Sequence, residues 1–229
     1  IIPSLLIGGE RTGYEFLRND VGARPSALGG AFVSFTGDLN SLYYNPAGLA
    51  VLKGRNFNFT YVDNILDFKI GTASYSQQLY KKGIIGCGIN FVDYGEFTGR
   101  DEFGNKTNTF GAKDVSFIVS YSYSIRDNFF IGGSGKFFYS KIEQYSSDGY
   151  AFDMGAIYYI KKQNLNIGIS LRNLGRVRKR FMESVDNLPA EFKGGFSKKL
   201  AYLPLILSFE FRRYSDGEEI YTGGGEFIL

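Results

Sequence analysis

Hydrophobic and polar residues alternate along most of the chain from residue 56 onward. Residues 116–125 show the pattern plainly, because every second residue is aromatic or aliphatic and the residues between them are mostly serine. A period of two places successive side chains on opposite faces of a β-strand. The alternation predicts about ten strands. They lie near residues 56–62, 68–79, 83–92, 114–125, 128–141, 149–160, 164–172, 190–200, 205–213 and 219–229.

The lengths of these segments and of their connections are typical of a membrane-spanning barrel. Most segments have about 9–12 residues, enough to cross a bilayer at a tilt of about 45°. Short connections alternate with longer ones, as in outer-membrane barrels, where periplasmic turns are short and extracellular loops are long. The short ones are 81–82, 126–127, 161–163 and 201–204; the others are 63–67, 93–113, 142–148, 173–189 and 214–218. We therefore predict an all-β fold, an antiparallel transmembrane β-barrel with residue 56 on the periplasmic side.

Composition supports this fold and argues against several kinds of chemistry. The chain has 30 glycines, 17 tyrosines and 22 phenylalanines in 229 residues, which suits a barrel wall with aromatic girdles. No apolar run approaches the roughly 18 residues of a transmembrane helix. The net charge of +3 is too small to indicate nucleic-acid binding. The absence of histidine removes the commonest general base and metal ligand, so we expect neither an enzyme nor a bound cofactor or metal.

The chain divides into three parts by pattern. Residues 1–9 resemble the end of a signal peptide, with an ordered apolar arm as the alternative. Residues 10–55 lack the period-two alternation and contain a candidate short helix near residues 13–19; the family resemblance described below implies that they form an N-terminal plug. Residues 56–229 form the predicted barrel, whose last strand pattern stops abruptly, so we expect a truncated C-terminal end.

A motif-rich stretch lies within the predicted plug. Residues 21–50 read VGARPSALGGAFVSFTGDLNSLYYNPAGLA. Pro46 fixes its own φ and favours an extended Asn45, whose side chain can then cap the following turn. This stretch resembles the N-terminal region of the PorV/PorQ family, within the FadL-like outer-membrane barrels. The matching positions are Gly22, Ala23, Arg24, Gly29, Gly30, Ala31, Phe32, Asn45, Pro46 and Ala47.

The resemblance covers about residues 14–52 and implies several properties. It implies a barrel of about 14 strands in the bacterial outer membrane, closed by an N-terminal plug. Gly29, Gly30, Asn45, Pro46 and Ala47 would have a structural or gating role in that plug. In the PorV/PorQ branch, the resemblance implies handling of proteins exported by the type IX secretion system.

Charged residues gather at two places in the predicted barrel. The first group lies on the inward, polar face and indicates either a hydrated, charge-paired lumen or a pathway for a polar ligand. This group comprises Lys136, Asp153, Glu191, Lys193, Glu210 and Arg212. The second group is the basic cluster Arg176, Arg178, Lys179 and Arg180, in the predicted external loop. It would bind lipopolysaccharide phosphates or an acidic partner, or it is an ordinary basic loop.

Two weaker motifs carry little chemistry. Residues 131–136 (IGGSGK) resemble a phosphate-binding loop, but they lack its first glycine and its final Ser/Thr and lie inside a strand. Asp101, Asn105 and Asn108 offer oxygens for a hard cation, at a spacing that matches no EF-hand.

Three functions remain open at this point. The first is a PorV/PorQ-type secretion or surface-attachment component whose extracellular rim engages exported proteins or secretion-system subunits. The second is a FadL-like channel for hydrophobic small molecules. The third is a soluble lipocalin-like binding barrel. The plug motif favours the first two, and its GAR-x-x-x-LGGAF spacing is closer to PorV/PorQ.

Overall fold

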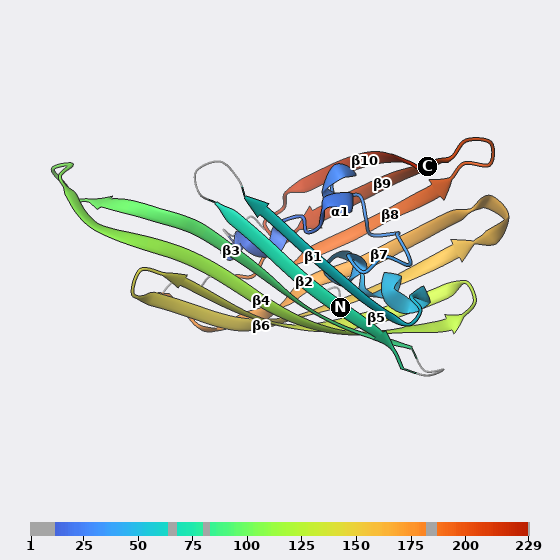
Figure 1. The fold of residues 1–229 in the computed structure, drawn as a ribbon, viewed down its shortest axis with the longest axis horizontal. Coiled ribbons are helices and arrows are strands. Elements are labelled where there is room, and N and C mark those ends of the chain that lie inside the picture. Colours follow the sequence, from blue (N-terminus) through green and yellow to red (C-terminus); the bar gives the residue numbers. More distant parts are fainter. Residues whose placement is uncertain (1–11, 64–67, 80–82, 182–186, 229) are drawn as a thin grey trace.

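The ten strands of the described residues belong to a single antiparallel sheet. The computed structural model describes residues 12–63, 68–79, 83–181 and 187–228, so the predicted signal-peptide end lies outside the described residues. The strands are β1 (Arg55–Asp63), β2 (Lys69–Gln78), β3 (Ile84–Arg100), β4 (Lys106–Arg126), β5 (Phe129–Ile142), β6 (Tyr145–Ile160), β7 (Leu165–Lys179), β8 (Glu191–Lys199), β9 (Leu205–Tyr214) and β10 (Glu219–Phe227). They follow one another in sequence order across the sheet (Figure 1). The predicted all-β antiparallel fold is confirmed.

Several predicted loops are wrong, because strands continue into them. Residues 93–113 form the outer half of the β3–β4 hairpin, which closes in a turn at residues 101–105 and projects farthest from the sheet (Figure 1). Residues 142–148 are mostly strand as well. The predicted loop at 173–189 begins as the end of β7, which continues to Lys179. The longer connections are therefore mainly extended hairpins on one rim of the sheet.

The predicted division between an outward apolar face and an inward polar face is present. On β4, Phe117 and Val119 are at least half exposed, whereas Ser120 and Ser122 are almost fully buried. This is the burial pattern that a period of two produces when one face of a sheet is covered.

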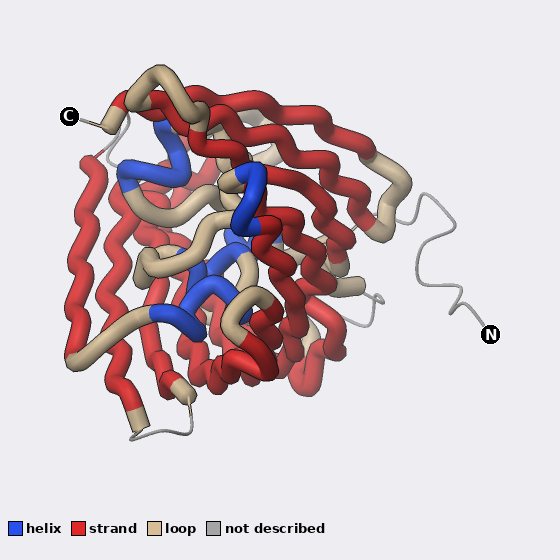
Figure 2. The backbone as a smooth tube through the Cα atoms, turned by 90° about the vertical axis from the view of Figure 1, so that its right-hand side faces the viewer, coloured by secondary structure: helices blue, strands red, loops and turns tan. Residues whose placement is uncertain are grey.

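The N-terminal segment covers that inner face. We call residues 12–54 the plug; it contains the helices η2 (Glu15–Arg18), α1 (Ala23–Ala27), α2 (Ser41–Tyr44) and η3 (Pro46–Val51). Figure 2 shows these short helices surrounded by the strands. Within the described residues β1 and β10 do not pair with each other, so the sheet is a curved, open-sided wall around the plug. No helix of the described chain has the length and apolar character needed to span a bilayer.

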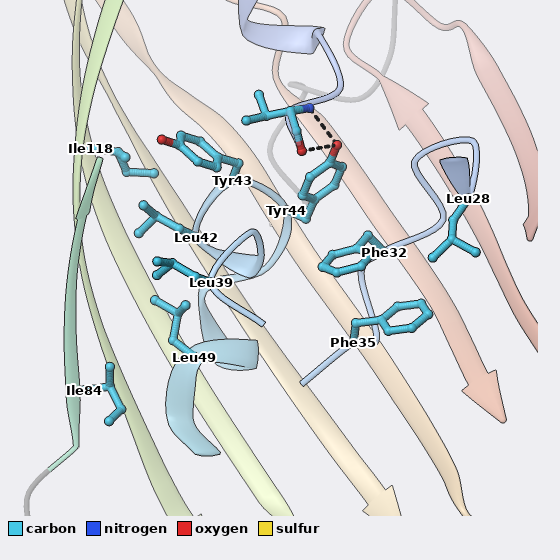
Figure 3. Close-up of a cluster of buried hydrophobic side chains, with 11 residues drawn as sticks. Leu28, Phe32, Phe35, Leu39, Leu42, Tyr43, Tyr44, Leu49, Ile84 and Ile118 are labelled. Atoms are coloured by element: carbon cyan, nitrogen blue, oxygen red, sulfur yellow. Dashed lines mark hydrogen bonds between the residues drawn. The ribbon is translucent and has the colours of Figure 1, made fainter. Parts of the chain in front are cut away.

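The main hydrophobic core lies between plug and wall. Phe32 and Phe35 stack with ring centroids 4.6 Å apart, and Tyr44 packs on Phe32. Plug leucines at positions 39, 42 and 49 point toward Ile84 of β3 and Ile118 of β4 (Figure 3). Each large apolar side chain buried here contributes about 1.5–3 kcal/mol. A second cluster joins Phe16 and Leu17 of the plug to β3, β5 and β6.

Candidate functional site

The NPA motif fastens the centre of the plug to the wall. Asn45 is extended and fully buried, and its Oδ1 accepts a hydrogen bond from Ala47 N at 3.1 Å, so it caps η3 with Pro46 in the first turn. Its Nδ2 donates to Val33 O at 2.7 Å and to Ile169 O on β7 at 3.2 Å. The Asn45 side chain thus links the plug to the sheet.

Wall serines bind the carbonyl groups around that motif. Ser122 Oγ of β4 donates to Pro46 O at 2.5 Å, and Ser170 Oγ of β7 donates to Tyr44 O at 3.1 Å. The short helices of the plug leave carbonyl groups without helical partners, and a buried carbonyl needs a donor. The serines of the inward face supply these donors.

Glycines on the wall make room for the plug backbone. A Cβ at Gly155 of β6 would collide with Asn45 Oδ1, and one at Gly132 of β5 would collide with the Pro46 backbone. Gly132 and Gly155 are directly paired across β5 and β6. The glycines whose missing side chain lies against the plug form what we call the glycine belt. Its members are Gly86, Gly88, Gly132, Gly155, Gly168, Gly195 and Gly224.

Glu210 of β9 holds the glycine-rich turn of the plug. Its Oε2 accepts hydrogen bonds from the backbone N–H groups of Phe32 at 2.9 Å and Val33 at 2.7 Å. Its Oε1 lies 2.6 Å from Arg212 Nε and 3.5 Å from Lys193 Nζ. The Glu210 side chain is fully buried. A buried carboxylate requires such compensation, because it has lost its hydration.

Gly29 and Gly30 form the turn that faces this carboxylate. Both have positive φ, at +62° and +78°, a conformation that favours glycine. A Cβ at Gly30 would also collide with the Arg212 guanidinium, whose Nη2 donates to Gly29 O at 3.3 Å. These two plug residues therefore serve the contact with β9 rather than a separate site.

The other predicted inward charges continue this network along the wall. Lys136 of β5 pairs with Asp153 of β6 at 2.7 Å, and Arg172 of β7 pairs with Glu191 of β8. A bulge between β6 and β7 gives Asn173 a φ of +56°, so that Arg172 and Asn173 are both buried. A charge-paired lumen was one of the two interpretations of this face, but the sequence indicated no particular pairs. The structure places these groups under the plug, where they are almost inaccessible to solvent, rather than along an open hydrated lumen.

Arg24 and Asn40 connect the plug to both edges of the sheet. Arg24 binds Glu226 of β10 through two nitrogens, at 2.8 and 2.7 Å, and Asp38 of the plug at 2.7 Å. Asp38 in turn accepts from Asn40 Nδ2 at 2.9 Å, and Asn40 Oδ1 accepts from Asn58 Nδ2 of β1 at 2.8 Å. This run of polar contacts, which we call the edge relay, spans from β10 to β1 through the plug.

Two plug tyrosines are buried with their hydroxyl groups bonded. Tyr43 Oη donates to carbonyls of β2 and β3 at 3.2 Å, and Tyr44 Oη contacts both N and O of Val21. Burial raises the pKa of Tyr43 to about 12, although a hydrogen bond with Ser74 acts in the opposite direction. Burial also raises the pKa of Tyr44 well above its usual value. Both residues are therefore neutral at physiological pH.

An apolar pocket opens beside the plug on the rim with the long hairpins. Its volume is about 540 Å³. Aromatic rings from three regions line it: Tyr14 from the plug, Tyr94, Phe97 and Phe110 from the β3–β4 hairpin, and Phe181 after β7. Asp114 and Ser140 form a small polar area within it. We call this the outer pocket.

A second pocket lies at the opposite rim, near the short turns. Its volume is about 420 Å³, and its lining mixes aromatic rings with charged and amide groups. Phe35 and Arg24 of the plug meet Phe130, Tyr159 and Lys199 of the wall there. We call this the inner pocket. The plug and its fastening residues lie between the two.

The predicted basic cluster lies on β7 rather than in a loop. Arg176, Arg178 and Lys179 belong to the strand, and Arg180 follows it. Arg178 binds Asp148 at 2.6 Å and Arg176 binds the Tyr150 hydroxyl at 2.9 Å, both across the β6–β7 pair. The four side chains are exposed, and none of them lines the outer pocket.

The candidate cation ligands at the β3–β4 turn serve the turn itself. Asp101 accepts hydrogen bonds from the backbone N–H groups of Phe103 at 2.9 Å and Asn105 at 2.8 Å. In the described part of the chain, no cluster of three or more Cys, Asp or Glu side chains is arranged to bind a metal ion.

Several residues of the site were not predicted from the sequence. The polar area of the outer pocket, Asp114 with Tyr94 and Ser140, comes from three different strands. The sequence placed Asp114 and Ser140 in predicted strands and Tyr94 in a predicted loop, with no sign that the three meet. The edge relay was also missed, because Glu226 lies 202 residues from Arg24. The one indication of the polar area in the sequence was the position of Asp114 on the inward face of the alternating pattern.

Comparison with known proteins supports the fold. Two crystal structures of the Pseudomonas putida toluene transporter TodX match with TM-scores of 0.62 and 0.63, at 14% and 13% identity. They cover 91% and 90% of this chain and 75% and 74% of theirs. A FadL homologue from Pseudomonas aeruginosa matches with a TM-score of 0.57 and 10% identity, covering 90% of this chain and 76% of its own. No protein-family model and no curated sequence matches. The fold is that of the FadL-like barrels.

Proposed function

We propose that this protein is an outer-membrane β-barrel channel that admits small hydrophobic molecules and is closed by its plug. The observation that carries the proposal is the outer pocket, an aromatic-lined cavity of about 540 Å³ with the plug as one of its walls. Ligand pockets are typically apolar cavities of about 300–1,000 Å³ with a few placed polar groups. The likeness in fold to a toluene transporter agrees with this proposal.

The outward face of the wall supports a membrane location. Large apolar side chains stand exposed along successive strands, and an apolar surface of that extent is rare on a soluble monomer. Among them are Phe57, Phe59, Phe117, Val119, Phe152, Met154, Ile167, Ile169, Leu207 and Phe209. The polar inward face differs from the apolar interior expected of a lipocalin-like binding barrel. A barrel that spans a bilayer has apolar residues on its lipid-facing side and polar residues on its inner side, as this wall does.

The arrangement of the two pockets supports a route controlled by the plug. The outer pocket shares Tyr14 with the plug, and the inner pocket shares Phe35 and Arg24 with it. The core contacts, the NPA motif and Glu210 close the space between them. Passage of a ligand would require these contacts to loosen, so the plug motif acts as the gate.

Uptake by cells tests this proposal. Cells without a hydrophobic-solute channel of their own would produce the protein, and entry of labelled toluene and a labelled long-chain alcohol would be measured. We expect uptake above that of empty cells, a loss in Phe110→Asp, which makes the outer pocket polar, and no loss in Phe103→Asp. Phe103 is the matched control because it stands 88% exposed at the hairpin tip. Uptake equal to that of empty cells would overturn the proposal.

A second candidate function is the handling of secreted proteins. It is supported by the resemblance of residues 21–50 to PorV/PorQ proteins and by the exposed basic cluster of residues 176–180 at the outer rim. Exposed groups on a rigid scaffold are where recognition often lies. In this alternative, the rim engages exported proteins and the plug stays closed.

Charge reversal of the basic cluster separates the two candidates. The variant would carry Arg176→Glu, Arg178→Glu and Lys179→Glu. If the protein captures exported proteins, the unmodified protein should bind them in a pull-down, the variant should lose that capture, and neither form should take up hydrophobic solutes. If it is a hydrophobic channel alone, neither form captures them and uptake is unchanged.

A further inference from the structure

The charged groups that line the outer pocket are both acidic. Among the described residues around it, they are Glu15 of the plug and Asp114 of β4. Glu15 lies 3.1 Å from Arg18, with which it forms an ion pair. Among the described residues no cation pairs with Asp114, which is 7% exposed. The pocket therefore holds one buried carboxylate whose charge no described neighbour neutralises.

Neutral hydroxyl groups hold Asp114 in position. Tyr94 Oη donates to Asp114 Oδ2 at 2.6 Å, and Ser140 Oγ donates to Oδ1. Lys113, the adjacent lysine, pairs instead with Asp93 at 2.9 Å and is largely exposed. In the described part of the chain, Asp114 takes part in no ion pair. These contacts fix the orientation of the carboxylate without cancelling its charge.

The carboxylate retains the capacity to bind a ligand. Each oxygen of an ionised carboxylate accepts about two hydrogen bonds, and the contacts above use one on each oxygen. The remaining capacity suits an O–H or N–H donor. A second anion would meet the charge of Asp114 in an apolar surrounding, where repulsion between like charges is strong.

The aromatic rings of the pocket point to the same ligand chemistry. Tyr94, Phe97 and Phe110 line it together with Asp114, and the rings of Phe97 and Phe110 lie 5.7 Å apart. The faces of aromatic rings attract cations and repel anions. The same rings also pack against the apolar part of a ligand, whatever its polar end.

We propose that Asp114 makes the outer pocket selective for hydrophobic molecules whose polar end donates a hydrogen bond, such as alcohols, phenols and alkylammonium ions, and excludes carboxylates. This inference rests on the proposed function, because it assigns the ligand class of the pocket that the channel would use. Asp114 binds the donor directly, and the aromatic rings hold the apolar body.

A matched set of ligands tests the inference. Decanol, decylammonium and decanoate share one apolar chain and differ in the polar end. Their binding to the protein in lipid nanodiscs would be measured against protein-free nanodiscs, which correct for partition into lipid. We expect wild-type protein to bind decylammonium and decanol at least tenfold more tightly than decanoate.

Two variants and one control assign the preference to Asp114. Asp114→Asn keeps the size and removes the charge, so decanoate should bind within about threefold of decanol. Ala112→Lys places a cation on the same face of β4, two residues away, and should reverse the preference toward decanoate even if Asp114→Asn does not insert. Asp93→Asn, which lies outside the pocket lining, should behave as wild type.

The outcomes separate this inference from the proposed function. Equal affinity of wild type for decanoate and decylammonium, or an unchanged preference in Asp114→Asn, would overturn the role of Asp114 alone. Decylammonium retained while decanol is lost would restrict the ligand class to cations. Binding of none of the three ligands, together with no uptake of toluene, would overturn the proposed function as well.

Discussion

Single buried groups determine how the plug meets the wall. Glu210 is the strongest case, because one carboxylate serves two plug N–H groups, Arg212 and Lys193. A buried ion pair adds little net stability when it is intact, but removal of one partner leaves the other charge uncompensated. The residue therefore matters more for the seating of the plug than for the strength of the wall.

Replacement of Glu210 tests this role. Glu210→Gln should lower the free energy of unfolding by about 3 kcal/mol or more, because Arg212 and Lys193 lose their buried anion. Urea titration of the protein in lipid vesicles measures the change. Glu218→Gln is the control: Glu218 lies 3.2 Å from Arg18 and is 54% exposed, so its loss should cost less than about 1 kcal/mol. Similar losses in the two variants would contradict the argument.

High pH should loosen the plug through its buried tyrosines. The pKa of Tyr43 is raised to about 12 in the folded protein, against about 10 when unfolded. Because the folded value is higher, the stabilising effect is fully present below about pH 10 and is lost as the pH rises through about 12. Limited proteolysis of the plug across pH 8–12 should show this, with the wall intact. Tyr43→Phe should reduce the pH dependence; an identical profile would count against Tyr43 as its source.

The sequence predicts contacts between residues close together in the chain, but not their partners on distant strands. The cap made by Asn45 on η3 follows from the order Asn-Pro-Ala, and the structure shows it. Its bond to Ile169 could not be predicted, because 124 residues separate the two and no local rule sets which strand faces the plug. The same holds for Asp114, whose partners come from neighbouring strands in a register that only the folded sheet defines.

The elements fit together through small residues. The glycine belt crosses β3, β5, β6, β7, β8 and β10 at the level of the plug. Glycine weakens a strand, because it gains no side-chain packing and loses more backbone entropy than other residues. Here the missing side chains let the plug backbone approach the wall closely. Part of the strand's own stability is thus exchanged for contact with the plug.

A substitution within the belt should displace the plug. Gly155→Val places a branched side chain where Asn45 Oδ1 lies, so the NPA motif cannot seat and the plug should become sensitive to protease while the strands persist. Gly135→Ala on the neighbouring strand is the control, because nothing lies within 4 Å of its added Cβ. Strand content by circular dichroism should be unchanged in both. Full protection of the plug in Gly155→Val would show that the belt is not needed for seating.

The strands could be predicted well where one face is covered, and poorly where it is not. All ten strands appear at the predicted places, because the plug or the core imposes a burial period of two. Above the plug the β3–β4 hairpin is exposed on both faces near its turn. Its residues need no alternation there, so residues 93–113 carried no strand signal. The same reason explains the outer end of β7.

At the scale of the whole molecule, the apolar outer face defines the environment. Ile167→Arg should cost about 2–4 kcal/mol in lipid if the position lies near the bilayer midplane. Tyr202→Arg, in the β8–β9 turn and 98% exposed, should cost close to nothing. Refolding titrations in lipid vesicles compare the two variants. Equal costs would mean that β7 does not face hydrocarbon.

The edge relay has a consequence for the order of events during folding. Neighbouring strands pair through short connections, whereas the Arg24–Glu226 contact closes a loop of 202 residues. Closing a loop of that size loses chain entropy before any contact forms. Arg24, which is synthesised early, can therefore make this contact only after β10 is in place. Until then the plug would be held by the earlier strands alone and would stay unanchored at this edge of the wall.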